Sequence, residues 1–505
     1  MEKENYVNKS KLIKNVVLGF GGQAIIIILG IIVPRIMIVS YGSDVNGLLN
    51  TISQIFTYMA LLEAGIGQAA RNALMKPLSQ GDRNGISHIT SVANNYYKRF
   101  TIYYGLITLV VAFCSPFIIK TDVEKIMVAM IFLFEGMSGV LSFSKIQTIT
   151  TVLTADGKNY INNGINVINK VISYSAKIIL ASLGVNILLL EAIYFIITVA
   201  KVFFYKRYFR KHYPWINLNA APKDTKLQDR NSYVITEIAW TIFSSTDLIV
   251  LSIFVNTKVS SVYGVYNLVF SNICLLLNTV FYSVNYLLGQ TYHKDRKLYL
   301  DIHDGFTSVF FGGMTCLMCT TYIMILPFVK IYTRGITDVE YIYTSLPLLF
   351  ALVQVLSWSR YITGNLSGVA GYAKITSYIS IIEAVLNVLL SIILVHKFGI
   401  VGVLFATVIA LPIKVIFLTW LSERKILKRN PLKYLSILFA NYILFTVTVI
   451  VSKHIEFNIN SYSEFFICSC VVLLSCALIT SALNIVVNPK VIQLLKKMRG
   501  SKQNG

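Results

Sequence analysis

The sequence predicts an all-α integral membrane protein with about fourteen transmembrane helices: two pseudo-symmetric six-helix lobes (a parallel repeat) around a central cavity, followed by two C-terminal helices. Three observations carry this prediction. Of the 505 residues, 55% are hydrophobic and only 13% are charged, which is far too apolar for a soluble globular protein. Apolar runs of membrane-spanning length recur along the whole chain. Several local motifs recur about 215 residues apart, which indicates an internal duplication.

The apolar runs have the length of transmembrane helices, because about 20 apolar residues are needed to cross a hydrocarbon core of about 30 Å. They are rich in Leu, Ile and Phe and lack the alternation of a membrane barrel. The first run is too long for a signal peptide and lacks a small-residue cleavage site, so we expect it to be retained. The predicted spans are 16–39, 46–71, 99–119, 125–153, 159–183, 185–208, 232–256, 259–290, 303–329, 340–366, 375–396, 399–421, 433–453 and 463–487.

The net charge of +22 is divided unequally between the two sides of the membrane, and this argues against a nucleic-acid partner. With the N-terminus in the cytoplasm, most Lys and Arg residues fall in the inner loops and tails. This is the positive-inside pattern, so we expect a multi-pass protein of the cell membrane with both termini in the cytoplasm. The cations of the predicted outer loops are Lys120, Lys125, Lys258, Lys330, Arg334, Lys397 and Lys453.

The predicted outer loops are too short for an extracytoplasmic catalytic domain, so we do not expect an enzyme. Cys316 and Cys319 have the C-x-x-C spacing of metal ligands, but they lie in an apolar segment without His or acidic partners. Small apolar packing is the better interpretation of both residues. We expect no cofactor, with H⁺ and Na⁺ as candidate coupling ions.

The clearest repeated motif is GVLSFSK at 139–145, which returns as QVLSWSR at 354–360, and Asn169 recurs in the same way as Asn387. Six predicted spans separate the copies, so both cross the membrane in the same sense and are related by an axis along the membrane normal. Such lobes are typical of alternating-access transporters; a duplication without transport is the alternative. The predicted domains are an N-lobe (1–208), a cytoplasmic linker (209–231), a C-lobe (232–421), and two further helices with a basic tail (422–505).

Seven cations lie inside the predicted spans, where a charge at the bilayer centre costs about 2.5–3.5 kcal/mol. Lys201 and Lys414 lie near cytoplasmic ends, where a long side chain can reach the headgroups. Lys170 lies mid-span and is the hardest to explain in this way, and Lys177 follows it on the same helix face. The other three are Arg35, Lys145 and Arg360.

Five of these seven cations but only three of the six acids inside the spans belong to the first lobe, which therefore carries excess positive charge. A cationic wall in a low-dielectric cleft attracts an anion. Phosphate or pyrophosphate suits it, because Lys offers a point charge and Arg a fork. Internal ion pairing, for instance between Lys145 and Glu135, is the alternative. The residues predicted to contact substrate on these grounds are Lys145, Lys170, Lys177 and Arg360.

The seventh predicted helix carries two acids, Glu237 and Asp247, and the second of these lies near mid-membrane. A buried carboxylate there is a candidate site for Na⁺ or a proton whose binding is coupled to transport. A structural salt bridge to cations of the first lobe is equally compatible with the sequence.

The first two predicted helices resemble a known family. The stretches IVPRIMIVSYG at 32–42 and LLEAGIGQAAR at 61–71 look like the opening of the Wzx-type polysaccharide and O-antigen flippases of the MOP (MATE-like) exporter superfamily. The resemblance implies that an undecaprenyl-pyrophosphate-linked oligosaccharide is moved from the inner to the outer leaflet for capsule or O-antigen export. It implies membrane lipids and polysaccharide polymerase machinery as partners, and it adds Arg35 and Arg71 to the substrate-binding residues.

In hydropathy the resemblance extends over helices 1 to 12. Fourteen spans are also similar to the lipid II flippases, whose last two helices help to form a lipid groove. Because helices 1, 2 and 8 carry fewer arginines than in those proteins, we expect a cargo other than lipid II. Two alternatives stay open. A cation-coupled multidrug exporter of the same fold would favour an acidic or apolar cavity, and a membrane glycosyltransferase or polymerase would need a substantial loop or acids at the outer surface.

Overall fold

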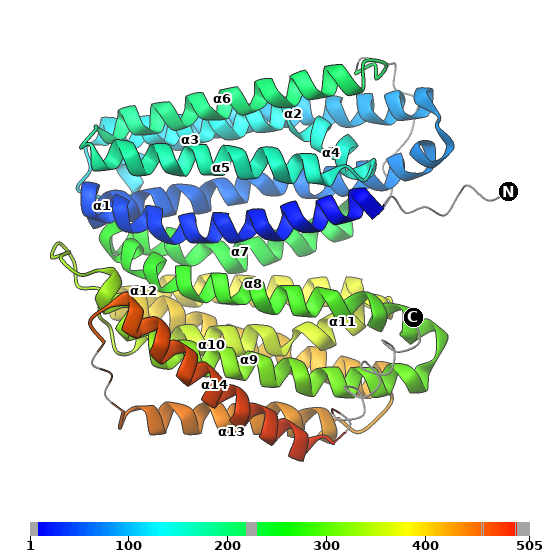
Figure 1. The fold of residues 1–505 in the computed structure, drawn as a ribbon, viewed down its shortest axis with the longest axis vertical. Coiled ribbons are helices and arrows are strands. Elements are labelled where there is room, and N and C mark those ends of the chain that lie inside the picture. Colours follow the sequence, from blue (N-terminus) through cyan, green and yellow to red (C-terminus); the bar gives the residue numbers. More distant parts are fainter. Residues whose placement is uncertain (1–8, 219–229, 456, 458, 490, 492–505) are drawn as a thin grey trace. The chain divides into compact units, whose positions relative to one another are not determined.

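The computed structural model describes residues 9–218, 230–455, 457, 459–489 and 491, and every regular element in these residues is a helix (Figure 1). The all-α fold class predicted from the sequence is therefore confirmed. The chain divides into two compact units, Met1–Ser261 and Val262–Gly505. The predicted domain boundaries stay a prediction, and residues 219–229 of the predicted linker lie outside the described part of the chain.

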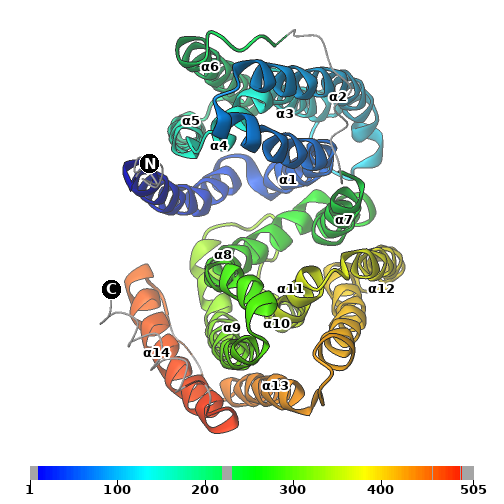
Figure 2. The ribbon, with the colours of Figure 1, turned by 90° about the vertical axis from the view of Figure 1, so that its right-hand side faces the viewer.

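The first unit is built on a long bent helix, α1. Gly42 bends this helix between two predicted spans, with φ at +84° in the left-handed region that glycine adopts at little cost. α1 packs against α5 and α7, and α2 packs against α3 (Figure 2). The helices are α1 (Lys9–Gln80), α2 (Arg83–Ile118), α3 (Lys125–Lys145), α4 (Gln147–Ala155), α5 (Asn159–Ser182), α6 (Ile187–His212), α7 (Arg230–Phe254) and the first turn of α8 (Thr257–Lys294).

The second unit contains the rest of α8 and a second long bent helix, α12, which bends at Gly399, the first residue of the predicted span 399–421, with φ at +53°. α13 and α14 both pack on α9 (Figures 1 and 2). The elements after α8 are α9 (Arg296–Tyr332), α10 (Leu346–Ser359), α11 (Tyr361–Val369), α12 (Ala373–Trp420), a π-helical turn (Leu421–Ile426), α13 (Leu432–Ser452) and α14 (Tyr462–Val487).

Ten helices in the described residues are long and apolar enough to cross a membrane. Two of these stretches, Gly21–Met59 and Ala373–Ile426, each hold two predicted spans. α5 and the apolar part of α7, Ile238–Phe254, supply the remaining two. α5 is less apolar than the others because Asn and Lys residues recur along it. The helices thus accommodate all fourteen predicted spans.

The duplicated motif marks a helix break in both copies. α3 ends at Lys145 and α4 begins at Gln147. In the same way, α10 ends at Ser359 and α11 begins at Tyr361, with Arg360 between them. Lys145 and Arg360, the last residues of the two copies of the motif, therefore lie at matching interruptions of the predicted spans, rather than within uninterrupted helices.

Glycines at equivalent positions of the two copies adopt the same unusual backbone. Gly157 and Gly371 follow the short helices α4 and α11 with φ of +69° and +83°. Gly184 and Gly399 lie at the next reversal of the chain with φ of +69° and +53°. Because this region of φ is costly for other residues, the glycines let each copy turn at the same two places.

A charged cluster fastens the C-terminal helices to α9. Arg429, which precedes α13, donates to Glu423 Oε2 at 2.6 Å and to Asp304 Oδ1 at 2.8 Å. Lys433 of α13 donates to Asp304 Oδ2 at 2.8 Å. Burial alone would lower the pKa of Arg429, but the hydrogen bonds to these carboxylates raise it. Asp304 and Glu423 are 4% and 0% exposed, so their burial depends on the two cations.

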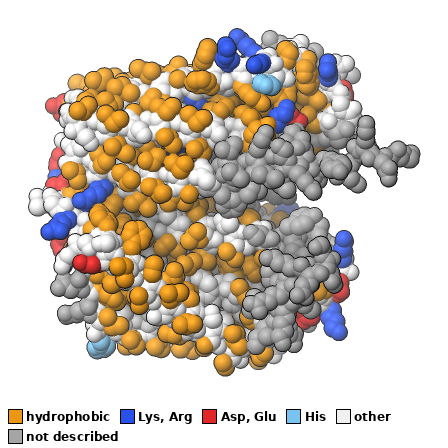
Figure 3. All heavy atoms as spheres, in the orientation of Figure 1, with side chains coloured by type: hydrophobic (Ala, Val, Ile, Leu, Met, Phe, Trp, Pro, Cys, Tyr) orange, Lys and Arg blue, Asp and Glu red, His pale blue; other side chains and the backbone are white. Residues whose placement is uncertain are grey.

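Apolar side chains also cover the outer faces of the helices (Figure 3). Phe113 and Phe117 of α2, Ile126 of α3 and Leu478 of α14 are each at least 70% exposed. Such surfaces would be a liability in water, whereas in a bilayer they meet hydrocarbon. The protein is accordingly a multi-pass membrane protein.

Candidate functional site

Charged and aromatic side chains of the first unit meet inside the membrane between α3, α5 and α6. Lys177 Nζ of α5 lies 2.9 Å from Glu191 Oε1 of α6, and the two side chains are 15% and 2% exposed. The ammonium also lies 4.4 Å from the ring centroid of Tyr194. Glu135 of α3 interacts electrostatically with both charges. Lys177 is therefore held in place by a carboxylate and an aromatic face.

Lys170, two turns before Lys177, has different surroundings. Its half-buried ammonium lies 3.5 Å from the Tyr174 hydroxyl and 5.1 Å from the centroid of the same ring. In the described part of the chain, no carboxylate lies within ion-pair distance of Lys170. Glu135 interacts with Lys170 electrostatically from a longer distance. The hydroxyl and the ring orient the ammonium without forming an ion pair, so it can still contact an anion.

The two cations of the duplicated motif also differ. Lys145 is exposed and has no carboxylate within ion-pair distance among the described residues. Arg360 is 4% exposed and donates to Glu383 Oε1, while Lys414 Nζ lies 3.5 Å from Glu383 Oε2. The second copy of the motif thus ends in a buried Arg–Glu–Lys group. The first copy carries a cation without an acid, and Glu135 lies with Lys177 rather than with Lys145.

The remaining predicted residues lie on α1 and α7. Arg35 is half-buried in α1, two turns before the bend at Gly42. Arg71 is half-buried inside α1, which continues to Gln80, so this residue does not end the helix. Asp247 of α7 is 6% exposed. The side chain of Glu237 lies outside the described residues.

A polar seam, which the sequence did not reveal, joins the bend of α1, the α2–α3 loop and the α7–α8 turn. Asp44 Oδ2 accepts from Thr121 Oγ1 at 2.8 Å and from the Asp122 amide at 2.7 Å. Asp44 Oδ1 accepts from the Thr257 hydroxyl. Because Asp44 is only 8% exposed, one buried carboxylate ties together three segments that are distant in sequence.

Backbone hydrogen bonds extend this seam. The Lys120 amide donates to the Ser252 carbonyl at 3.0 Å, and the Thr257 amide donates to the Lys120 carbonyl at 3.0 Å. Lys120 Nζ donates to the Phe254 carbonyl at 2.8 Å, and the hydroxyls of Thr51 and Ser252 share a hydrogen bond. All of these groups lie on the side that the charge pattern predicts to be extracytoplasmic. We call them the outer seam: Asp44, Thr51, Lys120, Thr121, Ser252 and Thr257.

Gly47 allows the close approach of α1 to the α7–α8 turn at the outer seam. A Cβ at this position would lie 1.7 Å from the Thr257 carbonyl oxygen and 2.9 Å from the Ser261 amide nitrogen. Asn46, its neighbour, donates to Ser261 Oγ at 2.8 Å. An Asn-Gly pair in an apolar segment is the signal that could have indicated a tight helix contact there.

Similarity to known proteins is found in structure and not in sequence. No protein-family model matches the sequence, and no curated protein matches it either. The lipid II flippase MurJ in an inward closed conformation superposes with a TM-score of 0.66 at 16% identity, over 93% of this chain and 99% of that one.

Multidrug transporters superpose as well. An inward-facing MATE family transporter of the MOP superfamily gives a TM-score of 0.64 at 13% identity, over 77% of this chain and 92% of that one. The MATE multidrug transporter DinF-BH gives 0.56 at 12% identity, over 83% of this chain and 96% of that one. The chain therefore has the fold of MOP-superfamily transporters.

Proposed function

We propose that the protein is a lipid-linked oligosaccharide flippase. It would move undecaprenyl-pyrophosphate-linked repeat units across the cytoplasmic membrane for capsule or O-antigen polysaccharide export, delivering them to polymerase machinery at the outer face. The transporter fold supports a membrane-transport role. The superposition with a lipid II flippase extends over nearly the whole of both chains, so the likeness includes more than the twelve helices of the repeat.

The observation that carries this proposal is that Lys170 lies inside the membrane without an ion-paired carboxylate among the described residues, with Glu135 interacting only from a longer distance. An ammonium near mid-membrane costs about 2.5–3.5 kcal/mol on insertion scales, and Lys170 has no carboxylate within ion-pair distance in the described residues to offset that cost. A transported diphosphate would offset it during each cycle. Lys145, equally without an acid in range among those residues, would provide a second contact nearer the cytoplasmic side.

The paired cations have a different part in this proposal. Lys177 is held by Glu191 at 2.9 Å and also interacts with Glu135, so it would keep the helices around Lys170 in place rather than bind the phosphate itself. Arg360 is ion-paired with Glu383, so it can bind a phosphate only when that ion pair breaks. Arg35 and Arg71 would meet the substrate along α1, as the family resemblance implies.

Alternating access requires a gate at each face, and the outer seam would be the gate at the outer face. Its hydrogen bonds hold the bend of α1 against the α7–α8 turn, on the side that the charge pattern predicts to be extracytoplasmic. Asp247, buried on α7 less than two turns before Ser252, and Glu237 are the candidate groups for coupling of the motion to H⁺ or Na⁺.

The test is a leaflet-translocation assay with purified protein in liposomes and defined undecaprenyl-pyrophosphate-linked oligosaccharides. Lys170→Ala removes a charge-assisted contact of about 1.5–3 kcal/mol, and a tenfold change corresponds to about 1.4 kcal/mol. We therefore expect the initial flipping rate to fall roughly tenfold or more at subsaturating substrate. Lys206→Ala, which removes a cation from the cytoplasmic end of α6, should leave the rate unchanged. An unaltered rate in the Lys170 variant would remove the site assignment.

A cation-coupled multidrug exporter is the second candidate. The arrangement of Glu135, Lys177 and Glu191 favours it, because a buried carboxylate pair around one ammonium could exchange a proton. The same liposomes distinguish the two functions. Uptake of a cationic dye driven by an ion gradient, without flipping of the glycolipid, would establish the exporter and exclude the flippase.

A further inference from the structure

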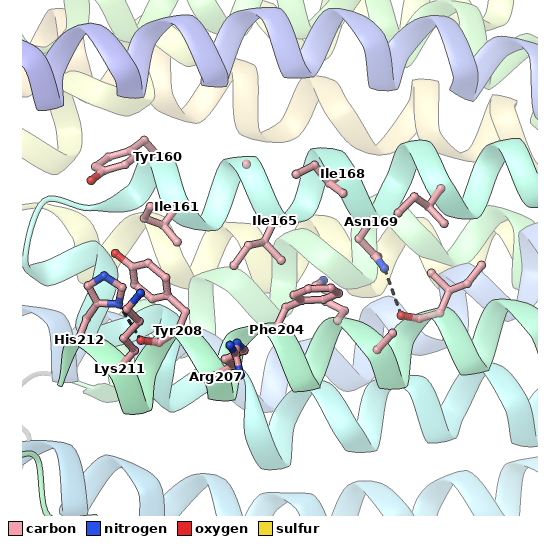
Figure 4. A pocket seen from close by; sticks show the side chains of 15 residues that line it. Tyr160, Ile161, Ile165, Ile168, Asn169, Phe204, Arg207, Tyr208, Lys211 and His212 are labelled. Atoms are coloured by element: carbon pink, nitrogen blue, oxygen red, sulfur yellow. Dashed lines mark hydrogen bonds between the residues drawn. The ribbon is translucent and has the colours of Figure 1, made fainter. Parts of the chain in front are cut away.

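A long groove runs between α5 and α6 on the first unit (Figure 4). It has a volume of about 810 Å³ and is open along one side. Ile165 of α5 points toward α6, where Phe204 also lines the groove, and Asn169 donates across its far end to the Ile197 carbonyl at 3.5 Å. The groove is therefore lined mainly by apolar side chains, and the Asn169 hydrogen bond joins its two walls at one end.

Positive charge gathers along the α6 side of the groove, toward the end of that helix (Figures 3 and 4). Lys201, Arg207, Lys211 and His212 line it, and no acidic residue is among the described residues that do so. The His212 ring stacks on Tyr208 with centroids 4.0 Å apart, and His212 Nδ1 lies 3.0 Å from the Tyr208 carbonyl. Arg207, Lys211 and His212 thus make the mouth of the groove cationic, whereas Lys201 lies about three helical turns deeper among apolar residues.

The second copy of the repeat shows that this charge is particular to the first. Lys414 is the repeat equivalent of Lys201, and it lies 3.5 Å from Glu383. The equivalence of Asn169 and Asn387 places Ile165 at the position of Glu383. Both asparagines donate to the following span, which supports the alignment. One copy thus neutralises its lysine internally, while the other leaves it in an apolar groove.

The sides of the groove face hydrocarbon rather than water. Ile168 and Phe204 are each 61% exposed in the protein, and Ile172 is 50% exposed. Large apolar side chains this exposed on both helices indicate contact with lipid. The cationic mouth lies at the end of α6 that the charge pattern predicts to be cytoplasmic, so the groove opens to the inner leaflet.

We infer that this groove is a binding site for one anionic phospholipid of the cytoplasmic leaflet. Its phosphodiester lies between Arg207 and Lys211, and one acyl chain runs inward along Ile165 and Phe204. Basic pockets between transmembrane helices on the cytoplasmic side are suited to such headgroups. Charge-assisted hydrogen bonds from Arg and Lys to the phosphate fix the lipid at one end. Lys201 in the groove interacts electrostatically with Lys170, but the phosphate end of the site lies at Arg207 and Lys211, nearer the end of α6. The proposal does not depend on the transported substrate.

The test measures lipid retained by the purified full-length protein. Detergent-solubilised protein is titrated with phosphatidylglycerol, or with phosphatidylcholine as the neutral comparison, and bound lipid is counted by native mass spectrometry. We expect one tightly retained phosphatidylglycerol per chain and no corresponding retention of phosphatidylcholine. Equal retention of the two lipids would overturn the proposal.

Two double variants distinguish lipid binding in the groove from non-specific attraction of the lipid to surface cations. Arg207→Ala with Lys211→Ala removes two cations that line the groove, and Lys206→Ala with Arg210→Ala removes two from the same turns of α6 that do not line it. We expect the first pair to weaken phosphatidylglycerol binding by roughly tenfold or more, and the second pair by less than twofold. Equal losses in both pairs would show general electrostatic attraction and overturn the site.

A third variant fills the groove without changing charge. Gly164 lines the groove, and a Cβ there would meet nothing within 4 Å. Gly164→Leu should therefore fold and should displace the acyl chain, lowering retention to the level of the Arg207 and Lys211 pair. Full retention in Gly164→Leu would refute the acyl position. Displacement of bound phosphatidylglycerol by an equimolar polyprenyl phosphate would instead assign the groove to the carrier lipid and overturn the phospholipid proposal.

Discussion

Gly47→Ala tests whether the outer seam is a gate. In the structure, the added Cβ would lie 1.7 Å from the Thr257 carbonyl oxygen, half the 3.4 Å at which ordinary contact begins. That oxygen belongs to backbone and cannot rotate away. α1 and the α7–α8 turn must therefore separate, and the hydrogen bonds of Asp44 and Thr51 across the seam must lengthen or break.

The expected size of the effect follows from the clash. Overpacking of a well-packed contact costs typically about 1–3 kcal/mol, which corresponds to about a 5- to 150-fold shift in a conformational equilibrium. Ala also favours the helix over Gly by about 1 kcal/mol, but it does so in both gate conformations. The population with an open outer seam should therefore rise by this factor.

Thiol accessibility in whole cells measures that population. Ser260 is fully buried, and its hydroxyl lies 2.7 Å from that of Ser252 in the outer seam. Ser260→Cys, in a chain whose seven native cysteines are replaced, should therefore react slowly with a membrane-impermeant maleimide. Adding Gly47→Ala should raise the labelling rate at least about fivefold. The matched control is Gly30→Ala on the same helix, because a Cβ there meets nothing within 4 Å.

Equal labelling rates with and without Gly47→Ala, at normal expression, would refute the reasoning, because a clash of this size cannot be absorbed while the seam stays closed. Faster labelling in Gly30→Ala as well would show that glycine replacement in α1, rather than the contact with Thr257, opens the protein.

Three further variants probe the charged groups. Glu383→Gln removes the carboxylate shared by Arg360 and Lys414, and removal of one partner from a buried pair costs about 3–5 kcal/mol. The thermal unfolding temperature in detergent should fall clearly, and Arg360→Leu in the same chain should partly restore it. Lys177→Met removes the ion-pair partner of the buried Glu191, so the unfolding temperature should fall by more than in Lys170→Met, which breaks no ion pair. Asp44→Asn keeps the size of the side chain but weakens acceptance from Thr121 and Thr257; maleimide labelling at Ser260→Cys should rise by less than in Gly47→Ala, and an unchanged rate would exclude Asp44 from the gate.

The fold could be predicted from the sequence because each membrane helix is indicated by the length and composition of its own segment. Span length, apolar composition and the offset of the GVLSFSK and QVLSWSR motifs predicted the helices without any tertiary information. The same motifs were expected inside continuous helices, and the structure places a break at Lys145 and Arg360 instead. The sequence carries no glycine or proline at either break to indicate it.

Pairing of charges was harder to predict than their presence. Arg360 and Lys145 look equivalent along the chain, yet of the two only Arg360 has a carboxylate partner among the described residues. The difference depends on α12, where Glu383 stands at the place of Ile165, and an alignment of the two copies through their asparagines would have revealed it. The Asn46-Gly47 pair could have indicated a tight contact at the outer seam, but its hydrogen bonds had no such signal, since Asp44, Lys120 and Thr257 come from three segments that only the folded chain brings together.

The attachment of α13 and α14 to α9 has a consequence for shortened forms of the chain. Asp304 is buried, and Arg429 and Lys433 lie beyond the last repeated helix. A truncation after α12 would strip both cations from that carboxylate and leave it charged in an apolar setting. The twelve-helix ancestor implied by the duplication therefore cannot be recovered by trimming alone: an Asp304→Asn or Asp304→Leu exchange would have to accompany the cut.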